Sequence, residues 1–142
     1  MKLIEIQGDI FNYRNVAHGV NCQGVMGAGV AVGFRDRCPE MYQEYREFCR
    51  MGLLEPGKML PWQRASGGWV FNLATQDKPG RYARVEWIRQ SVTAMLDYAK
   101  YADIRNLHSV RLGCGIGGLQ WPTVRTALES INSPQTLTIV SQ

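Results

Sequence analysis

Two glycine-rich segments hold most of the chemistry that this sequence suggests. One runs from Asn21 to Ala31 (NCQGVMGAGVA) and the other from Gly113 to Gly118 (GCGIGG). Glycine lets backbone N–H groups approach a phosphate closely, and a helix that starts at such a loop adds a favourable dipole. Two loops of this kind could hold a diphosphate from both sides. Taken singly, each loop is explained equally well by tight turns, because neither matches a Walker A loop or a dinucleotide-binding fingerprint.

Three polar residues close to these loops have side chains suited to ligand contacts. Asp9 could accept a hydrogen bond from an amino group, and Asn21 could both donate and accept. His18 could carry a proton near neutral pH. Turn propensity alone makes Asp9 a turn residue and Asn21 a strand-end cap. A buried, hydrogen-bonded structural histidine is likewise an alternative for His18, because regular strand alternation puts it on the opposite face from Asn21 unless a bulge intervenes at Gly19.

The four cysteines do not predict a metal site. Cys22, Cys38, Cys49 and Cys114 include no Cys-x-x-Cys pair, and the chain has only two histidines. We expect reduced, mostly buried thiols. Cys114 lies in the second glycine loop and could be a nucleophile, but the loop lacks the arginine that a thiolate phosphatase needs, so we assign its side chain to packing.

Alternating strands and helices would position these residues. We expect strands at Lys2–Gln7, Val16–Cys22, Lys58–Leu60, Trp69–Thr75, Ser109–Leu112 and Thr136–Val140, and helices at Val30–Arg37, Glu40–Arg50, Arg84–Tyr101 and from Trp121 to Ile131. This order predicts one domain over residues 1–142, with an α/β fold of three layers, α/β/α, around a central mixed, largely parallel sheet. Both glycine loops would follow the carboxyl ends of strands, where open α/β sheets bind ligands.

Composition narrows the class of protein further. The net charge is +4 and the pI about 9.0, and the basic residues are scattered rather than clustered. No run of about 20 apolar residues and no signal-peptide core is present. We therefore expect a cytoplasmic monomer without a membrane segment.

Three motifs taken together resemble the macrodomain family. They are Gly8-Asp9-Ile10 after the first strand, Val20-Asn21-Cys22 ahead of Met26–Ala31, and the late segment Gly113–Trp121. The resemblance extends from Ile4 to about Val140. The stretch Arg111–Trp121 is similar to the branch that contains terminal ADP-ribose glycohydrolases, DNA ADP-ribosyl glycohydrolase antitoxins and fungal-type ADP-ribose-1″-phosphate phosphatases.

The resemblance implies ADP-ribose or a derivative as ligand, no cofactor, no metal, and nucleic-acid contact only through an ADP-ribosyl group. Asp9 would accept from the adenine amino group beside the Ile10 backbone, and Asn21 would reach the distal ribose. The glycine loops would enclose the diphosphate. The implied ligand-binding set is Gly8, Asp9, Ile10, Asn21, Gly27, Ala28, Gly29, Val30, Thr75, Gly113, Cys114, Gly115, Ile116, Gly117, Gly118 and Leu119.

The chain departs from the glycohydrolase branch at the two catalytic positions. That branch uses a lysine just after the strand at 69–75 and an aspartate in the late glycine loop, and Gln76 and Gly117 stand at the matching positions. Neither can supply an amine or a carboxylate, and we assign nearby Asp77 and Lys78 to a solvated loop. The sequence conflicts less with the phosphatase branch. For that reaction, Asn21 and His18 are the candidate catalytic residues.

Three functions remain open at this point. The first, which we favour, is a hydrolase of a small ADP-ribose derivative, of the ADP-ribose-1″-phosphate phosphatase type. The second is an ADP-ribosyl glycohydrolase with a non-standard residue set, acting on protein or DNA. The third is a binding module that recognises ADP-ribose without turnover.

Overall fold

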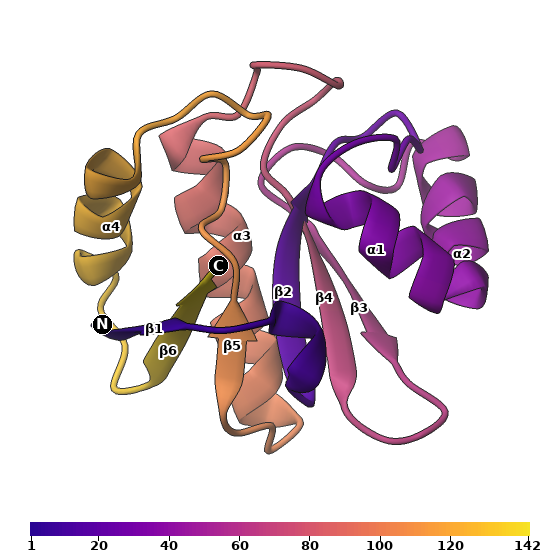
Figure 1. Cartoon of the computed structure of the whole chain (residues 1–142). Helices are drawn as coiled ribbons and strands as arrows, with labels where there is room; N and C mark the ends of the chain where they lie inside the picture. The colour runs from indigo at the N-terminus through magenta and orange to yellow at the C-terminus, as the bar shows by residue number, and fades with distance from the viewer.

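The computed structural model describes all 142 residues, and its strands form one sheet in the order β1-β6-β5-β2-β4-β3 (Figure 1). The strands are β1 (Lys2–Gln7), β2 (Asn15–Val20), β3 (Met59–Gln63), β4 (Trp69–Ala74), β5 (Leu107–Ser109) and β6 (Thr136–Ser141). All neighbouring pairs are parallel except β3 and β4, which run antiparallel. The prediction of a mixed, largely parallel sheet is confirmed.

Four α-helices connect the strands, together with one short 3-10 helix. They are α1 (Val30–Arg37), α2 (Pro39–Arg50), α3 (Val85–Tyr101), α4 (Trp121–Glu129) and η1 (Ile10–Asn12). Pro39 occupies the first turn of α2, where its missing N–H removes no helical hydrogen bond. The apolar stripe on α3 is buried as its spacing predicts, since Ile88, Val92 and Leu96 are all almost fully inaccessible.

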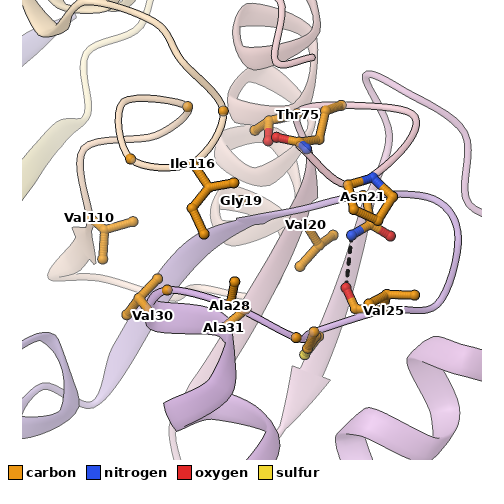
Figure 2. A pocket seen from close by; sticks show the side chains of 18 of the residues that line it. Gly19, Val20, Asn21, Val25, Ala28, Val30, Ala31, Thr75, Val110 and Ile116 are labelled. Atoms are coloured by element: carbon orange, nitrogen blue, oxygen red, sulfur yellow. Dashed lines mark hydrogen bonds between the residues drawn. The ribbon is translucent and has the colours of Figure 1, made fainter. Parts of the chain in front are cut away.

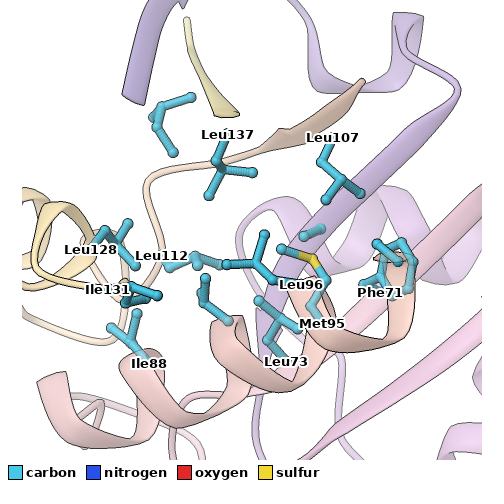
Figure 3. Close-up of a cluster of buried hydrophobic side chains, with 14 of the residues drawn as sticks. Phe71, Leu73, Ile88, Met95, Leu96, Leu107, Leu112, Leu128, Ile131 and Leu137 are labelled. Atoms are coloured by element: carbon cyan, nitrogen blue, oxygen red, sulfur yellow. The ribbon is translucent and has the colours of Figure 1, made fainter. Parts of the chain in front are cut away.

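The sheet separates two apolar cores, which gives the predicted three layers. Successive strand residues point to opposite faces, so Ala17 and Phe71 pack with α3 and α4. Their neighbours Val16 and Val70 pack with α1 and α2. Figure 3 shows the first core, in which side chains of α3 and α4 meet Leu107 and Leu137 of the sheet.

Three strands differ from the sequence prediction by two or more residues at an end, and one of them is β2, which ends at Val20 instead of Cys22. The predicted strand Ser109–Leu112 is wrong beyond its first residue, because β5 ends at Ser109 and Val110 begins the loop toward the cleft. Leu112 lies outside any strand, and its apolar side chain is fully buried. At the edge of the sheet, β3 extends to Gln63 and includes Pro61, which an edge strand tolerates. Strand β1 forms the other edge of the sheet, and Ile4 is accordingly 41% exposed.

Candidate functional site

A cleft lies at the carboxyl ends of β2, β4 and β5, as expected for an open α/β sheet. It consists of two cavities, of about 370 and 600 Å³. Both cavities are lined by Gly29, Val30, Val110 and Arg111, so they adjoin at the start of α1 and the end of β5. A ligand that fills both cavities must be elongated and must pass the first turn of α1.

The larger part of the predicted ligand-binding set lines this cleft. The first cavity brings together Asn21, Gly27, Ala28, Gly29, Val30, Thr75, Gly113, Gly115, Ile116 and Gly117. Gly8 and Ile10 line the second cavity. The two glycine loops therefore face each other across one space, although more than 80 residues of chain separate them.

Unpaired backbone amides line both sides of the first cavity. The N–H groups of Gly27–Ala31 donate no hydrogen bond within the protein, and neither do those of Gly115, Ile116 and Gly117. The first group leads into the N-terminus of α1, where the helix dipole adds partial positive charge. Amides arranged in this way are suited to bind an anion such as a phosphate group.

Gly29 determines how closely the two loops approach. It precedes α1 with φ 64° and ψ −150°, a conformation that L side chains rarely adopt. A Cβ built on Gly29 would lie 3.4 Å from Cδ1 of Ile116 in the opposite loop. Figure 2 shows Ile116 directed across the cleft toward the loop that carries Ala28 and Val30. Ile116 thus covers the row of free amides.

Asn21 is held by hydrogen bonds at the end of β2. Its Nδ2 donates to the carbonyl of Val25 at 2.8 Å (Figure 2), and its Oδ1 accepts from the N–H of Gln23 at 2.9 Å. The hydroxyl of Tyr45 lies 2.7 Å from the backbone carbonyl oxygen of Asn21 and 3.0 Å from Oδ1, so its one hydrogen serves mainly the backbone oxygen. One N–H of Nδ2 is left free. Asn21 can donate to a ligand or a water but is unsuited to accept a proton.

His18 does not face the cleft. It is fully buried, stacks on Phe34 of α1 and hydrogen-bonds Oδ1 of Asn72 through Nε2 at 2.7 Å. Burial lowers the pKa of His18 to about 4, which keeps the imidazole neutral. Strand β2 ends at Val20, so the alternation of side chains between the two faces of the sheet does not continue from His18 to Asn21. The arrangement corresponds to a structural histidine, and it is unsuited to general acid–base catalysis in the cleft.

Asp9 lies beside the second cavity but does not line it. Its Oδ1 accepts from the N–H of Phe11 at 2.9 Å and so caps η1. Gly8 and Phe11, on either side of it, are lining residues. The second carboxylate oxygen of Asp9 is left to accept from another donor.

Three other predicted residues of the second glycine loop line neither cavity. The side chains of Cys114 and Leu119 pack against the core formed with α3 and α4, and Arg81 packs on Gly118. Burial raises the pKa of the Cys114 thiol, which disfavours the thiolate. The assignment of Cys114 to packing is therefore confirmed for its side chain.

Gln76 and Gly117 lie next to each other in the first cavity. The amide nitrogen of Gln76 donates to the carbonyls of Lys78 and Gly80, at 2.7 and 2.9 Å. A Cβ built on Gly117 would lie 3.1 Å from Oε1 of Gln76, 2.8 Å from the carbonyl oxygen of Gly113 and 2.7 Å from Cβ of Ala83. The loop is thus closed tightly around a residue without a side chain.

Sequence reasoning missed several residues that line the cleft. They are Gly19, Val20, Val25, Met26, Ala31, Pro79, Val110 and Arg111 in the first cavity, and Phe11, Val32, Gly33, Val140, Ser141 and Gln142 among those of the second. Most are apolar or small residues whose types carry no chemical signal. Arg111 is the charged side chain of this set, but its guanidinium lies 3.8 Å from Glu5 and over the ring of Trp121.

No metal centre or membrane-spanning element accompanies the cleft. No cluster of three or more histidine, cysteine or acidic side chains could hold a metal ion. None of the helices combines the length and the apolar character that crossing a bilayer requires.

Comparisons with known proteins agree with this geometry. The model of the Macro domain family matches residues 17–128. A DNA ADP-ribosyl glycohydrolase from Thermus aquaticus is 30% identical over 113 residues, which cover 78% of this chain and 31% of that protein. An ADP-ribose 1″-phosphate phosphatase from Meyerozyma guilliermondii is 38% identical over 64 residues, which cover 42% of this chain and 37% of that protein.

A solved structure matches nearly the whole chain. The macrodomain of Thermus aquaticus DarG superposes with a TM-score of 0.84 at 27% identity, and covers 99% of this chain and 97% of that one. The chain spans about a third of the length of the DNA ADP-ribosyl glycohydrolases that it matches.

Proposed function

The chain belongs to the macrodomain family, and we propose that it binds ADP-ribose and hydrolyses a small derivative of it, namely ADP-ribose-1″-phosphate. The observation that carries this proposal is the pair of facing loops with unpaired backbone amides between two adjoining cavities. A diphosphate would lie at the N-terminus of α1, where Gly29 and Val30 line both cavities. One end of the ligand would occupy each side: adenosine in the second cavity and the distal ribose in the first.

The adenine end would be recognised near η1. Phe11 offers an apolar ring face in the second cavity, and the free oxygen of Asp9 is an acceptor suited to the adenine amino group. At the other end, the remaining N–H of Asn21 would donate to a hydroxyl of the distal ribose or to a water. These roles follow from the donor and acceptor capacity that each side chain has left.

The reaction would be hydrolysis of a phosphomonoester. A water oxygen attacks the phosphorus, the bond between phosphorus and the oxygen on C1″ breaks, and the proton of the water ends on that departing oxygen. The products are ADP-ribose and inorganic phosphate. Free amides of Gly115–Gly117 would stabilise the charge that develops on the phosphoryl oxygens.

Turnover should be slow, because no side chain in the cleft is a strong base or nucleophile. Asn21 carries a neutral amide, which is not a base, and His18 is buried outside the cavity. The protein would therefore orient the water, and proton transfer would involve the substrate's own groups or solvent.

A second candidate is the glycohydrolase reaction, which the similarity to the Thermus DNA ADP-ribosyl glycohydrolase favours. The lysine route of that branch needs an amine at position 76 and a carboxylate at position 117. Gln76 and Gly117 supply neither, so we place this candidate second. A binding module without turnover is the third candidate, and it shares the ligand.

One set of assays separates these candidates. We expect wild-type protein to bind ADP-ribose more tightly than AMP in calorimetric titrations, because AMP lacks the groups that would fill the first cavity. We expect slow phosphate release from ADP-ribose-1″-phosphate and no release of ADP-ribose from modified DNA. Equal affinity for AMP and ADP-ribose would contradict the binding mode. Efficient release from DNA would reverse the order of the two enzymatic candidates, and no turnover of either substrate would leave the binding module.

A further inference from the structure

We propose that Gln76 recognises the distal sugar: its side-chain oxygen accepts a hydrogen bond from a hydroxyl group of the ribose far from the adenine. The inference rests on the proposed function, since it requires an ADP-ribosyl ligand in the cleft. Gln76 follows β4 and lines the first cavity, together with Thr75 and Asn21. It is therefore a specificity-determining residue, and its role does not depend on the amine chemistry of a lysine.

The orientation of the Gln76 amide is fixed by the loop that follows it. Its Nε2 donates both hydrogens to the carbonyls of Lys78 and Gly80. Carbonyl oxygens only accept, so the nitrogen must face this loop and the oxygen must face the other way. A flipped amide would place two oxygens against each other and lose both hydrogen bonds.

Position 117 carries no side chain beside Oε1 of Gln76, and both residues line the first cavity. Gly117 has no Cβ in the position 3.1 Å from Oε1, and Oε1 accepts no hydrogen bond within the protein. The oxygen thus combines a fixed direction with free acceptor capacity. It is these two properties together that distinguish Gln76 from the other polar residues of the cleft.

The chemistry of this oxygen selects a hydroxyl over a phosphate. An amide oxygen attracts a donor and repels phosphoryl oxygens, which are acceptors themselves. At the end of the neighbouring strand β2, Asn21 offers one N–H donor, and the amides of the glycine loops offer further donors. Sugar hydroxyls can satisfy both kinds of group at once, which suits a neutral ribose at this end of the cleft.

The test compares ADP-ribose with ADP, which lacks the distal ribose, by isothermal titration calorimetry. Gln76→Met keeps the length of the side chain and removes the acceptor. We expect this variant to bind ADP-ribose about three- to tenfold more weakly, the effect of one neutral hydrogen bond, and to bind ADP as the wild type does. Gln23→Met is the matched control, because Gln23 also donates to this loop, at the carbonyl of Asp77, but does not line the cavity. It should change neither affinity.

A second variant separates recognition from loop positioning. Gly80→Ala disturbs the loop, because Gly80 has φ 108° and an added Cβ would lie 3.1 Å from the ring of Tyr82, but it leaves the oxygen of Gln76 in place. It should therefore preserve the preference for ADP-ribose over ADP to within about twofold. Equal loss of that preference in Gln76→Met and Gly80→Ala would mean that Gln76 only positions the loop, and would overturn the inference. Unchanged ADP-ribose affinity in Gln76→Met would overturn it as well. If wild-type protein does not prefer ADP-ribose to ADP, the proposed function fails together with this inference.

Discussion

At the scale of single residues, the neighbours of a side chain decide which chemistry it has left. Asn72 donates to the carbonyl of Leu60, so its Oδ1 must accept from His18, and the proton of the neutral imidazole lies on Nε2. Nδ1 is buried and has no partner. A residue type that often carries protons in enzymes is thus confined to one neutral tautomer in the core.

The buried imidazole makes folding stability depend on pH. In the unfolded chain His18 gains a proton as the pH falls through its ordinary value of 6.5, whereas in the folded protein the pKa is about 4. Stability is therefore full above pH 6.5, falls between 6.5 and 4, and is not reduced further by this group below 4. We expect a loss of about 3 kcal/mol across that window.

Urea denaturation at pH 7 and pH 4 measures this effect. His18→Gln is the reference, because it removes the titrating group while carboxylates contribute equally to both proteins. The wild type should lose about 3 kcal/mol more than the variant over this range. An identical loss in both proteins would assign the pH dependence to other groups.

Asp9 has two functions that two substitutions can separate. Asp9→Ala removes both oxygens, so we expect a loss of about 1 kcal/mol of stability from the cap of η1 and of about 1–3 kcal/mol of ADP-ribose binding. Asp9→Asn keeps an oxygen for the N–H of Phe11 but places an amino group where the adenine amino group would donate. Thermal unfolding and calorimetry should show wild-type stability with weakened binding. Wild-type affinity in Asp9→Asn would remove Asp9 from the ligand site.

At the scale of elements, the cleft depends on how α1 packs against η1. A Cβ on Gly33 of α1 would lie 2.5 Å from Cζ of Phe11, so the ring of Phe11 fits only because position 33 has no side chain. The same ring lies under the guanidinium of Arg37, one turn further along α1. Helix α1 therefore contributes its N-terminus to the first cavity. To the second cavity it contributes Gly33, whose missing side chain leaves room for the ring of Phe11.

Gly33→Ala tests this contact between elements. Alanine favours the helix by about 1 kcal/mol, but the added methyl must displace Phe11, at a cost of about 1–3 kcal/mol. We expect lower thermal stability despite the better helix former. AMP and ADP-ribose should both bind more weakly, because both would place adenine beside Phe11. A more stable protein with unchanged affinity for AMP would show that the ring moves without consequence.

At the scale of the whole molecule, the core formed with α3 and α4 supports the second glycine loop. Cδ1 of Ile88 lies 2.8 Å from the position that a Cβ on Gly113 would take, so α3 packs directly beneath the loop backbone. Leu128 of α4 belongs to the same core and is equally buried. A change at Ile88 should therefore affect both the packing of the core and the position of the loop. A change at Leu128 should affect the packing of the core alone.

Two truncations in that core measure the coupling. Ile88→Ala and Leu128→Ala should each destabilise the protein by about 2–5 kcal/mol, since each removes a fully buried side chain. We expect only Ile88→Ala to weaken ADP-ribose binding, because the cavity that it leaves adjoins Gly113. Affinities should be measured at a temperature at which both variants are folded. An equal effect of the two variants on affinity would contradict a local coupling.

The sequence predicted the fold well because the spacing of apolar residues and the residues that end helices and strands are local signals. The stripe on α3 and the bounds of α1 follow from residues near to one another in the chain. The site was predicted in part, because glycine loops at strand ends can be recognised without a structure. The contact between Gln76 and Gly117 and the burial of His18 on Phe34 join distant segments, and no local pattern contains them.

The packing around Gly117 also limits the order in which this sequence can change. An aspartate at position 117 would bring its Cβ to 2.7 Å from Cβ of Ala83 and 2.8 Å from the carbonyl oxygen of Gly113. A chain that acquires this carboxylate must therefore also shrink residue 83, for example by Ala83→Gly, and reshape the loop. A lysine at position 76 could appear in one step but would lack its partner. Each single substitution toward the glycohydrolase pair is therefore either obstructed or without benefit, so the two could be established only together with a change in the loop.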